Sequence, residues 1–441
     1  MKSVRACIGI GCGALLAALS GLAAATQPQA SLSAAMDLIL KENRPLPAIE
    51  MLRTGVEDGT IPATQVSAQF YAVSGDSPGT YRMNDRHNDV IADYGAPPDL
   101  PDAKLLPAIP AIVRASAGKR VVMLNEDHYH QMHRAFGLQV LNALRTAGFT
   151  HFGAETFSPS VNESMADGAP DLRTGVYTSD PLYADMARQA AAKGYVLFDY
   201  DQRPEQDSGK GSAEDQRLAR ERAQAGNIAA ILKTHPAARI FIYAGSGHIA
   251  ESSSPGGAKW MAQILKEEHG VDPLTVNQVI GTPRSRPNLD GPLYQAVSST
   301  LPLARPSAVS TSDGLLTERG FDMVIFHPRE QQIRGRADWM RIDGYRRPCR
   351  VAIPASPQAT MIRAFVDSED SRSIPMDQVR VSPRQTEAML ALPVGTYRLV
   401  RQTLTDDEVI GKGVITSRGR GAKRNDLCLP VSIDGTAGAA G

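Results

Sequence analysis

Acidic residues and histidines gather in one short stretch of this sequence, directly after a run of apolar residues. The stretch runs from Val121 to His133 and reads V-V-M-L-N-E-D-H-Y-H-Q-M-H, with three of the chain's nine histidines. The apolar run at its start is typical of a buried strand in a parallel sheet. A carboxylate such as Glu126 beside an imidazole such as His128 can orient a general base or hold a metal ion. We therefore expect a functional site at the end of this strand.

Further acids follow two later apolar runs. Glu155 ends the run that begins at His151, and Asp199 and Asp201 end the run that begins at Tyr195. The carboxyl ends of parallel strands share one edge of a sheet, so Glu155 is expected near the first acid, where the two carboxylates share a proton or bind a cation. The two aspartates either add a carboxylate, orient a histidine, or simply form a turn.

A glycine-rich turn carries another histidine. Gly-Ser-Gly-His248 follows the apolar run that ends at Ala244, and its glycines allow the backbone to place the imidazole over the crevice. Ser246 is a weaker candidate, since the nucleophile elbow G-x-S-x-G is absent. Without a phosphate-binding glycine motif after a strand, we do not expect a nucleotide enzyme. Arg220 lies in a strongly charged helical segment and, taken alone, indicates only a solvated face.

Strand and helix patterns alternate through the middle of the chain. Such alternation predicts an α/β fold with a mostly parallel sheet and helices on both faces. The predicted strands are 120–124, 151–155, 195–200, 239–244, 274–280 and 322–326, and the predicted helices are 130–147, 182–193, 213–234 and 258–269. The segments 283–293 and 298–312, rich in proline and serine, are expected to be loops or a lid.

The flanking regions differ from this core in character. We predict a signal peptide over 1–25, an N-terminal helical segment over 26–100, the α/β core over 101–335, a C-terminal all-β, sandwich-like domain over 340–435 and a disordered tail over 436–441. The chain is accordingly expected in the periplasm or outside the cell. Loss of the signal peptide leaves Cys349 and Cys428, for which a disulfide is the default expectation, with two free thiols as the alternative.

The overall charge excludes some partners. Lysine plus arginine equals aspartate plus glutamate at 47 each, and aromatic residues make up 5% of the chain. Neither value favours a nucleic-acid or membrane surface, so we expect no nucleic-acid partner.

The motifs, taken in order, are similar to one group of proteins. Asn125-Glu-Asp-His128 with His133, then Glu155, then Arg220-Glu221, then Gly245-Ser-Gly-His248 resembles the pattern of the erythromycin-esterase-like, ChaN-like (haem-uptake lipoprotein) and Tiki superfamily. The likeness covers about half of the mature chain. The interval from His128 to His133 favours the haem-uptake branch. Asn125 stands where the family usually has the glycine before the glutamate.

The resemblance implies a crevice that carries the acids, the histidines and the arginine. We predict catalytic roles for Glu126, His128, Glu155, Arg220 and His248, and ligand contacts for Asn125, His133, Asp199, Asp201 and Ser246. The candidates for a metal site are Glu126, His128 and His248.

Two functions are compatible with this set. The first is a hydrolase of an ester, lactone or amide, in which His128 or His248 activates water, the glutamates orient that base or hold a divalent cation (Mn, Co or Zn), and the arginine stabilises the oxyanion. The alternative is a haem- or metal-binding uptake protein of the ChaN-like type. The expected partner is a small-molecule or peptide substrate, and the C-terminal β-domain is a candidate surface for a protein or glycan.

Overall fold

The structure is a computed structural model, and it describes residues 27–57, 65–87, 99–254, 257–318, 320–333 and 335–415. The predicted signal peptide, the predicted tail and Cys428 lie outside the described residues. Cys349 is buried in the C-terminal β-region. Cys349 is disulfide-bonded, and the assignment of Cys428 as its partner stays a prediction.

The centre of the molecule is a parallel sheet of six strands, and all six coincide with predicted strands. The sheet order is β4-β3-β5-β2-β6-β9, and every neighbouring pair is parallel. The strands are β2 (Val121–Glu126), β3 (His151–Ala154), β4 (Val196–Phe198), β5 (Ile240–Gly245), β6 (Leu274–Asn277) and β9 (Met323–Val324). The predicted fold class is confirmed.

Helices cover both faces of this sheet because its strands are apolar on both sides. Val122 and Leu124 of β2 pack in the same cluster as α7 (Gln131–Thr146) and α9 (Pro181–Ala192), together with α6 (Ala108–Ala115). Val121 and Met123, which point the opposite way, pack with α10 (Ala213–Thr234) and α11 (Met261–His269). Successive side chains of a strand alternate between faces, so one continuous apolar run fills two cores.

The connections leaving β2 and β5 diverge at the middle of the sheet. The chain runs from β2 through α7 to β3 on one side, and from β5 through α11 to β6 on the other. Adjacent strands whose connections turn to opposite faces form the topological switch point at which α/β proteins place ligands. The polar residues that follow β2 and β5 are therefore brought to that point.

The segments expected to be loops contain regular structure. Pro292 occupies the first turn of α12 (Pro292–Thr300), where a missing N–H costs nothing. Residues Ser307–Thr311 form β7, the middle strand of an antiparallel sheet with β1 (Lys104–Pro107) and β8 (Gly314–Leu315). The prediction of loops over 283–293 and 298–312 was thus wrong for α12 and β7, because proline and serine at element starts were taken as breakers.

The C-terminal region is antiparallel. One sheet has the order β14-β13-β16-β17 and a second pairs β12 with β15, and side chains from both sheets share one core. The strands are β12 (Arg347–Ala352), β13 (Thr360–Val366), β14 (Asp377–Val381), β15 (Glu387–Leu392), β16 (Gly395–Gln402) and β17 (Asp407–Ile415). The remaining short elements are α8 (Val161–Ser164), η1 (Val176–Ser179), η2 (Pro204–Gln206), η3 (Pro287–Leu289), β10 (Gln332–Ile333), β11 (Arg336–Ala337) and η4 (Asp338–Gly344).

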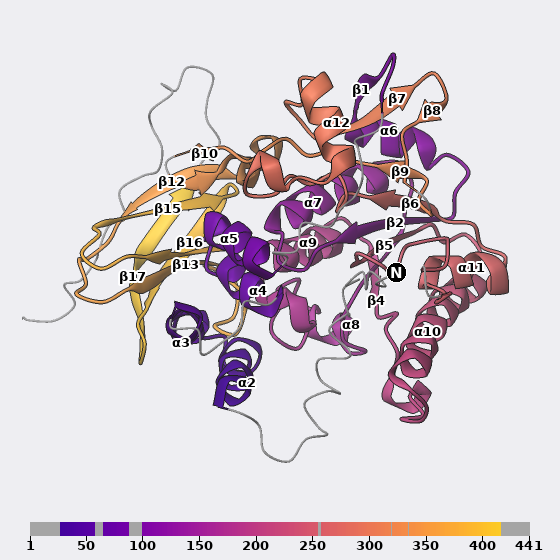
Figure 1. Cartoon of the computed structure of the whole chain (residues 1–441). Helices are drawn as coiled ribbons and strands as arrows, with labels where there is room; N and C mark the ends of the chain where they lie inside the picture. Colours follow the sequence, from indigo (N-terminus) through magenta and orange to yellow (C-terminus); the bar gives the residue numbers. More distant parts are fainter. Residues whose placement is uncertain are drawn as a thin grey trace, which may run out of the picture.

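Four N-terminal helices pack beside this β-region, so the two ends of the described chain lie together (Figure 1). They are α2 (Gln27–Leu40), α3 (Pro45–Glu57), α4 (Gln65–Val73) and α5 (Ser77–His87). The N–H of Leu46 donates to the side chain of Gln402 at 3.0 Å, and the N–H of Arg380 donates to the carbonyl of Ser74 at 2.9 Å. The β-region also joins the α/β core through Arg346, which pairs with Asp185 at full burial. The predicted domain boundaries stay predictions, but contacts across them are extensive.

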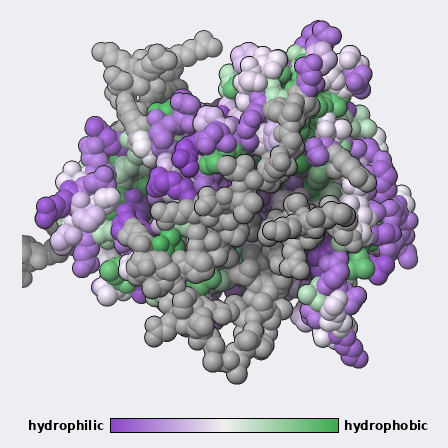
Figure 2. Space-filling view, in the orientation of Figure 1, coloured by the Kyte–Doolittle hydropathy of each residue, from purple (hydrophilic) through white to green (hydrophobic). Residues whose placement is uncertain are grey.

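The charged helix α10 has a solvated face, as its sequence indicates, and also a buried face. Hydrophilic residues predominate at the right-hand edge of the molecule, where α10 and α11 lie (Figure 2). Its inner face buries Glu221, Gln224, Ala225 and Ile228. Within the described residues, no helix is both long and apolar enough to cross a membrane.

Candidate active site

Three neighbouring strand ends bring the acidic residues together. Glu126 is the last residue of β2 and pairs in register with Gly245, the last residue of β5. Glu155 follows β3, whose final residue Ala154 pairs with Tyr243 of β5. Both glutamate side chains are 1% exposed. The shared edge that the sequence predicted is therefore formed by β3, β5 and β2 in that order.

Glu126 orients His128. Its Oε1 lies 2.9 Å from Nδ1 of His128, and Arg134 of α7 donates to both of its oxygens at 2.9 Å. Burial raises the pKa of Glu126, but Arg134 and the bond to His128 outweigh burial and lower it. An ionised Glu126 accepts a hydrogen bond from Nδ1–H of His128, and Nε2 of the same ring faces Glu155.

Glu155 lies at the centre of the site. Its Oε1 accepts a hydrogen bond from Nη2 of Arg220 at 2.9 Å, and its Oε2 accepts one from the N–H of Gly245 at 2.6 Å. Burial raises its pKa, yet the positive charge of His248, the hydrogen bond from His248 and the charge of Arg220 hold it well below its usual range. Glu155 is therefore a carboxylate at neutral pH.

Arg220 reaches the site from the inner face of α10. It donates from Nε and Nη2 to the two oxygens of Asp201, at 2.8 and 2.7 Å. Gln224, one turn further along the helix, donates to the same Asp201 at 3.0 Å. Such a two-pronged pair fixes the guanidinium plane as well as its charge. The arginine that sequence alone would assign to a solvated face thus contacts the predicted site.

His248 is held by a second buried carboxylate. Its Nδ1 lies 2.9 Å from Oε1 of Glu221, and its Nε2 lies 3.4 Å from Oε1 of Glu155. Glu221 is itself fixed by the N–H of Met261, which donates to its Oε2 at 2.8 Å. Burial lowers the pKa of His248, but Glu221 and Glu155 raise it to about 10. His248 is therefore an imidazolium at neutral pH.

The imidazole rings of His128 and His248 face the carboxylate of Glu155 from two sides. Nε2 of His128 lies 3.9 Å from Oε2 of Glu155, while Nε2 of His248 faces Oε1. Each ring is backed at Nδ1 by its own glutamate, and His248 carries a proton on both ring nitrogens. We call Glu126, His128, Glu155, Arg220, Glu221 and His248 the two-histidine cluster.

Glycine is required at position 245. A Cβ placed there would lie 2.9 Å from Oε2 of Glu155 and 2.9 Å from Nε2 of His128. Both distances are too short for ordinary contact. The absence of a side chain thus allows the carboxylate and the imidazole to approach the end of β5, which explains the first glycine of the Gly-Ser-Gly-His motif.

Two predicted ligand contacts tie strand ends together. The Oδ1 of Asn125 accepts a hydrogen bond from the N–H of Gln278 at 2.9 Å, and its Nδ2 donates to the carbonyl of Ser246 at 3.1 Å. Asn125 is fully buried, so it links the end of β2 to the loops after β5 and β6. Ser246 contributes its backbone carbonyl to this link, and its side chain is half-buried.

The other predicted contacts divide between the cluster and its surroundings. Asp201 binds Arg220 within the cluster, whereas Asp199 pairs with Arg203 at 3.0 Å. His133 is fully buried: its Nδ1 accepts a hydrogen bond from the N–H of Asp127 at 3.0 Å, and its Nε2 lies 2.7 Å from the hydroxyl of Thr282. The structure thus brings Asp201 to the site and engages Asp199 and His133 elsewhere.

Three contributors were absent from the predicted set. Arg134 follows Glu126 by eight residues and meets it only because α7 folds back over the sheet. Glu221 adjoins Arg220 and could have been found from that position. Tyr177, in η1, stacks on His128 with ring centroids 4.2 Å apart and an interplanar angle of 24°. Nothing local in the sequence marks Tyr177, since it reaches His128 from a loop between β3 and β4.

The carboxylates at the centre of the cluster bind arginine side chains, and His248 is protonated. The carboxylate of Glu126 binds Arg134, that of Glu155 binds Arg220, and His248 carries a proton on each ring nitrogen. In the part of the chain that the structure describes, no three His, Cys, Asp or Glu side chains are grouped to hold a metal ion. His133 has both ring nitrogens hydrogen-bonded. The carboxylates of Glu126 and Glu155 and the rings of His133 and His248 therefore do not fit as ligands of a divalent cation or a haem iron.

Comparison with known proteins gives only distant structural likenesses. No protein-family model matches the chain, and no curated protein matches it. Among solved structures, ChaN of Campylobacter jejuni, described with cofacial haem binding, is 9% identical with a TM-score of 0.32, covering 52% of this chain and 99% of that one. The type III effector HopBA1 is 18% identical with a TM-score of 0.27, over 35% and 81% of the two chains.

A toxin domain is similar to the same degree. RRSP, a MARTX toxin effector domain from Vibrio vulnificus CMCP6, is 13% identical with a TM-score of 0.29, over 49% of this chain and 43% of that one. The structural neighbours thus include a haem-binding ChaN and toxin effector domains. At these values the likenesses carry no inference about activity, and the predicted superfamily stays a prediction.

Proposed function

We propose that the chain hydrolyses an acyl bond of an ester, lactone or amide, with water as the nucleophile. One observation supports this above all: the imidazoles of His128 and His248, each backed at Nδ1 by a buried glutamate, both face the carboxylate of Glu155 at the topological switch of the sheet. General acid–base catalysis needs a base and an acid at one reacting centre. His128 and His248 supply them.

The residues would act in the following order. Nε2 of His128 takes a proton from water, whose oxygen forms a bond to the acyl carbon. Arg220 and the positive charge of His248 stabilise the negative oxygen of the tetrahedral intermediate. The bond from the acyl carbon to the leaving oxygen or nitrogen breaks as His248 gives that atom a proton. The proton on His128 then passes to His248 and restores both groups.

Exposure indicates the direction from which a substrate approaches. The side chains of His128 and His248 are 7% and 8% exposed, that of Arg220 is 12% exposed and that of Asp201 is 23% exposed. The cluster therefore opens to solvent on the side of the Arg220–Asp201 pair. Burial of the remaining groups strengthens their electrostatic interactions, as an active site requires.

The location of the reaction belongs to the proposal as well. The first 25 residues resemble a signal peptide, and we place the hydrolase in the periplasm or outside the cell. Haem or metal uptake, the alternative function, has less support, because two of the three predicted histidine ligands are engaged: His133 is hydrogen-bonded at both ring nitrogens and His248 is protonated, which leaves His128 alone.

The test is a panel of nitrophenyl esters, lactones and peptide amides, assayed with the purified chain and two variants. We expect turnover of at least one class, and loss of that turnover in His128→Ala. The matched control is His235→Ala, an exposed histidine just after α10, at the opposite edge of the sheet. Equal loss in both variants, or turnover that survives in His128→Ala, contradicts the proposal.

A further inference from the structure

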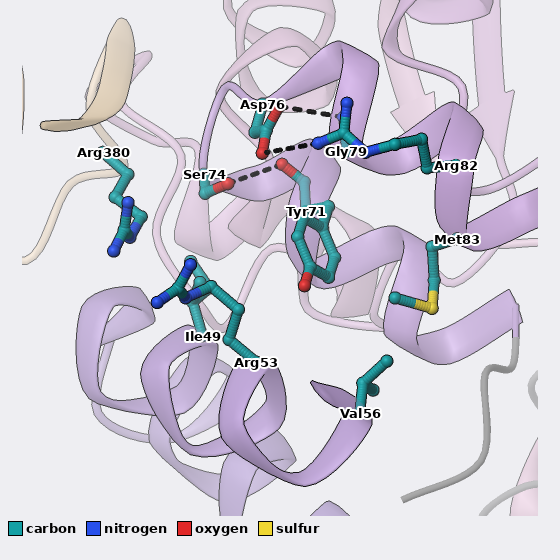
Figure 3. Close-up of a pocket in the computed structure, with 10 residues that line it drawn as sticks. All are labelled: Ile49, Arg53, Val56, Tyr71, Ser74, Asp76, Gly79, Arg82, Met83 and Arg380. Atoms are coloured by element: carbon teal, nitrogen blue, oxygen red, sulfur yellow. Dashed lines mark hydrogen bonds and ion pairs between the residues drawn. The ribbon is translucent and has the colours of Figure 1, made fainter. Parts of the chain in front are cut away.

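A cavity of about 190 Å³ lies outside the α/β core, where the N-terminal helices meet β14 (Figure 3). Its arginines are paired within the chain. Glu50 lies 2.5 Å from Arg380 and 3.7 Å from Arg53, and Asp76 faces Arg82 at 3.9 Å. This cavity therefore shows no need of a ligand among its described residues, whereas a turn beside the two-histidine cluster has a feature that packing alone does not require.

The turn that follows β3 has a strained backbone. The N–H of Phe157 donates to the carbonyl of Ala154 at 3.1 Å and closes a turn of four residues. Thr156, the third of the four, has a φ of 65°. A turn with positive φ at this position normally has glycine or asparagine there, and a β-branched residue rarely adopts it. Such strain persists only where the surrounding structure holds it, and it gathers at functional sites.

The side chain of Thr156 makes a bond that glycine could not make. Its Oγ1 accepts a hydrogen bond at 3.3 Å from the N–H of Tyr177, which lies 21 residues further along the chain, in η1. The adjoining backbones are also joined, since Phe157 pairs with Gly175 in an antiparallel bridge. A Cβ on Gly175 would clash with the carbonyl oxygen of Thr156. The turn and η1 are therefore packed as one unit.

Both parts of this unit contact the same imidazole. Glu155, the second residue of the turn, has its carbonyl held by the hydroxyl of Tyr183 at 2.6 Å, and its Oε2 lies 3.9 Å from Nε2 of His128. The ring of Tyr177 stacks on His128, with centroids 4.2 Å apart and an interplanar angle of 24°. Thr156 thus joins the residue that faces the edge of the His128 ring to the residue that covers its face.

We propose that Thr156 is a positioning residue for His128. Its hydroxyl fixes η1 so that Tyr177 lies flat on the imidazole, and the left-handed backbone is what places the hydroxyl within reach of η1. The consequence for turnover rests on the proposed hydrolysis. The position of the His128 ring does not, so the two can be tested separately.

The test compares Thr156→Gly and Thr156→Ser with the parent chain. NMR of ring-labelled histidine reports the position of His128, because a stacked tyrosine ring shifts the imidazole protons upfield. In Thr156→Gly we expect these resonances to move downfield and kcat to fall by about tenfold or more with KM little changed, because the base is misplaced while binding is kept. Thr156→Ser keeps the hydroxyl and should retain the parent resonances and most of kcat.

The matched control is Arg384→Gly. Arg384 has a φ of 66° in an exposed turn between β14 and β15, so this variant relieves similar strain away from the cluster. It should leave the His128 resonances and kcat unchanged. If urea unfolding shows that Thr156→Gly does not fold, Thr156→Val replaces it, since valine keeps the branched shape and removes only the hydroxyl.

Unchanged His128 resonances in the variant without the hydroxyl overturn the proposal. It is overturned equally if Thr156→Ser, or the control, displaces them as far. A parent chain without turnover of any substrate would refute the hydrolysis, and the resonances alone would then decide whether Thr156 positions His128.

Discussion

Replacing Glu221 by glutamine should lower the pKa of His248 towards neutral pH. The pKa of His248 rises from 6.5 to about 10 although burial opposes the rise, and Glu221 and Glu155 cause it. Such a rise corresponds to about 5 kcal/mol in favour of the imidazolium, at 1.36 kcal/mol for each tenfold change. Removing one of two neighbouring carboxylate charges should lower the pKa by roughly 1–3 pH units.

The substitution is well suited to isolating charge from packing. Glutamine keeps an oxygen that can accept the hydrogen bond now donated by the N–H of Met261 to Glu221. Titration of His248 by NMR of ring-labelled histidine, in parent and variant, measures the shift directly. Glu214→Gln is the control, since Glu214 lies on the same helix with its side chain 62% exposed. An unchanged titration in Glu221→Gln, or a parent value near 6.5, would refute the electrostatic account.

The same pKa has a consequence for stability. A group whose pKa is raised by folding contributes fully below its unfolded pKa, and its contribution is lost as pH rises through the folded value. For His248 the contribution is therefore complete below about 6.5 and disappears towards about 10. We expect the free energy of unfolding of the parent to fall across that range, and the fall in Glu221→Gln to begin at the same pH, to end at a lower pH and to be smaller.

Three further perturbations follow from the geometry. Gly245→Ala should abolish turnover and lower the urea midpoint, because a Cβ would meet both Glu155 and His128; a crystal structure with the two side chains unmoved and full activity would contradict this. Activity should persist after exhaustive treatment with EDTA, because the site carboxylates bind arginines; loss restored by a divalent cation would show otherwise. Arg346→Met should destabilise the fold by about 3–5 kcal/mol in urea unfolding, because it leaves the buried charge of Asp185 without its partner; an unchanged midpoint would refute that assignment.

The central sheet was predictable because its strands are buried on both faces. Apolar runs such as Val121–Leu124 have no alternation, and segments with a helical pattern separate them. The helix Ala213–Thr234 was predicted with its observed bounds, and the structure shows Ser212 and Asp215 forming a reciprocal cap at its start. Proline-rich segments were less tractable, because Pro292 begins a helix as readily as it ends one.

Only the site residues that directly follow a strand could be predicted from the sequence. Glu126 and Glu155 stand directly after apolar runs, so parallel pairing alone brings them together. Arg134 and Tyr177 reach His128 and its glutamate through the path of a helix and a loop, which depends on tertiary packing. Neither the neighbouring residues in the sequence nor the composition of the chain indicates such contacts.

The central claim is that His128 activates water for acyl transfer. The most direct measurement is kcat/KM of parent and His128→Ala on a substrate identified in the panel, with and without added imidazole. We expect kcat/KM to fall by about 10²–10⁴-fold, the range for loss of a general base, and free imidazole to restore part of it in this variant only. A value of kcat/KM in His128→Ala equal to that of the parent would contradict the account.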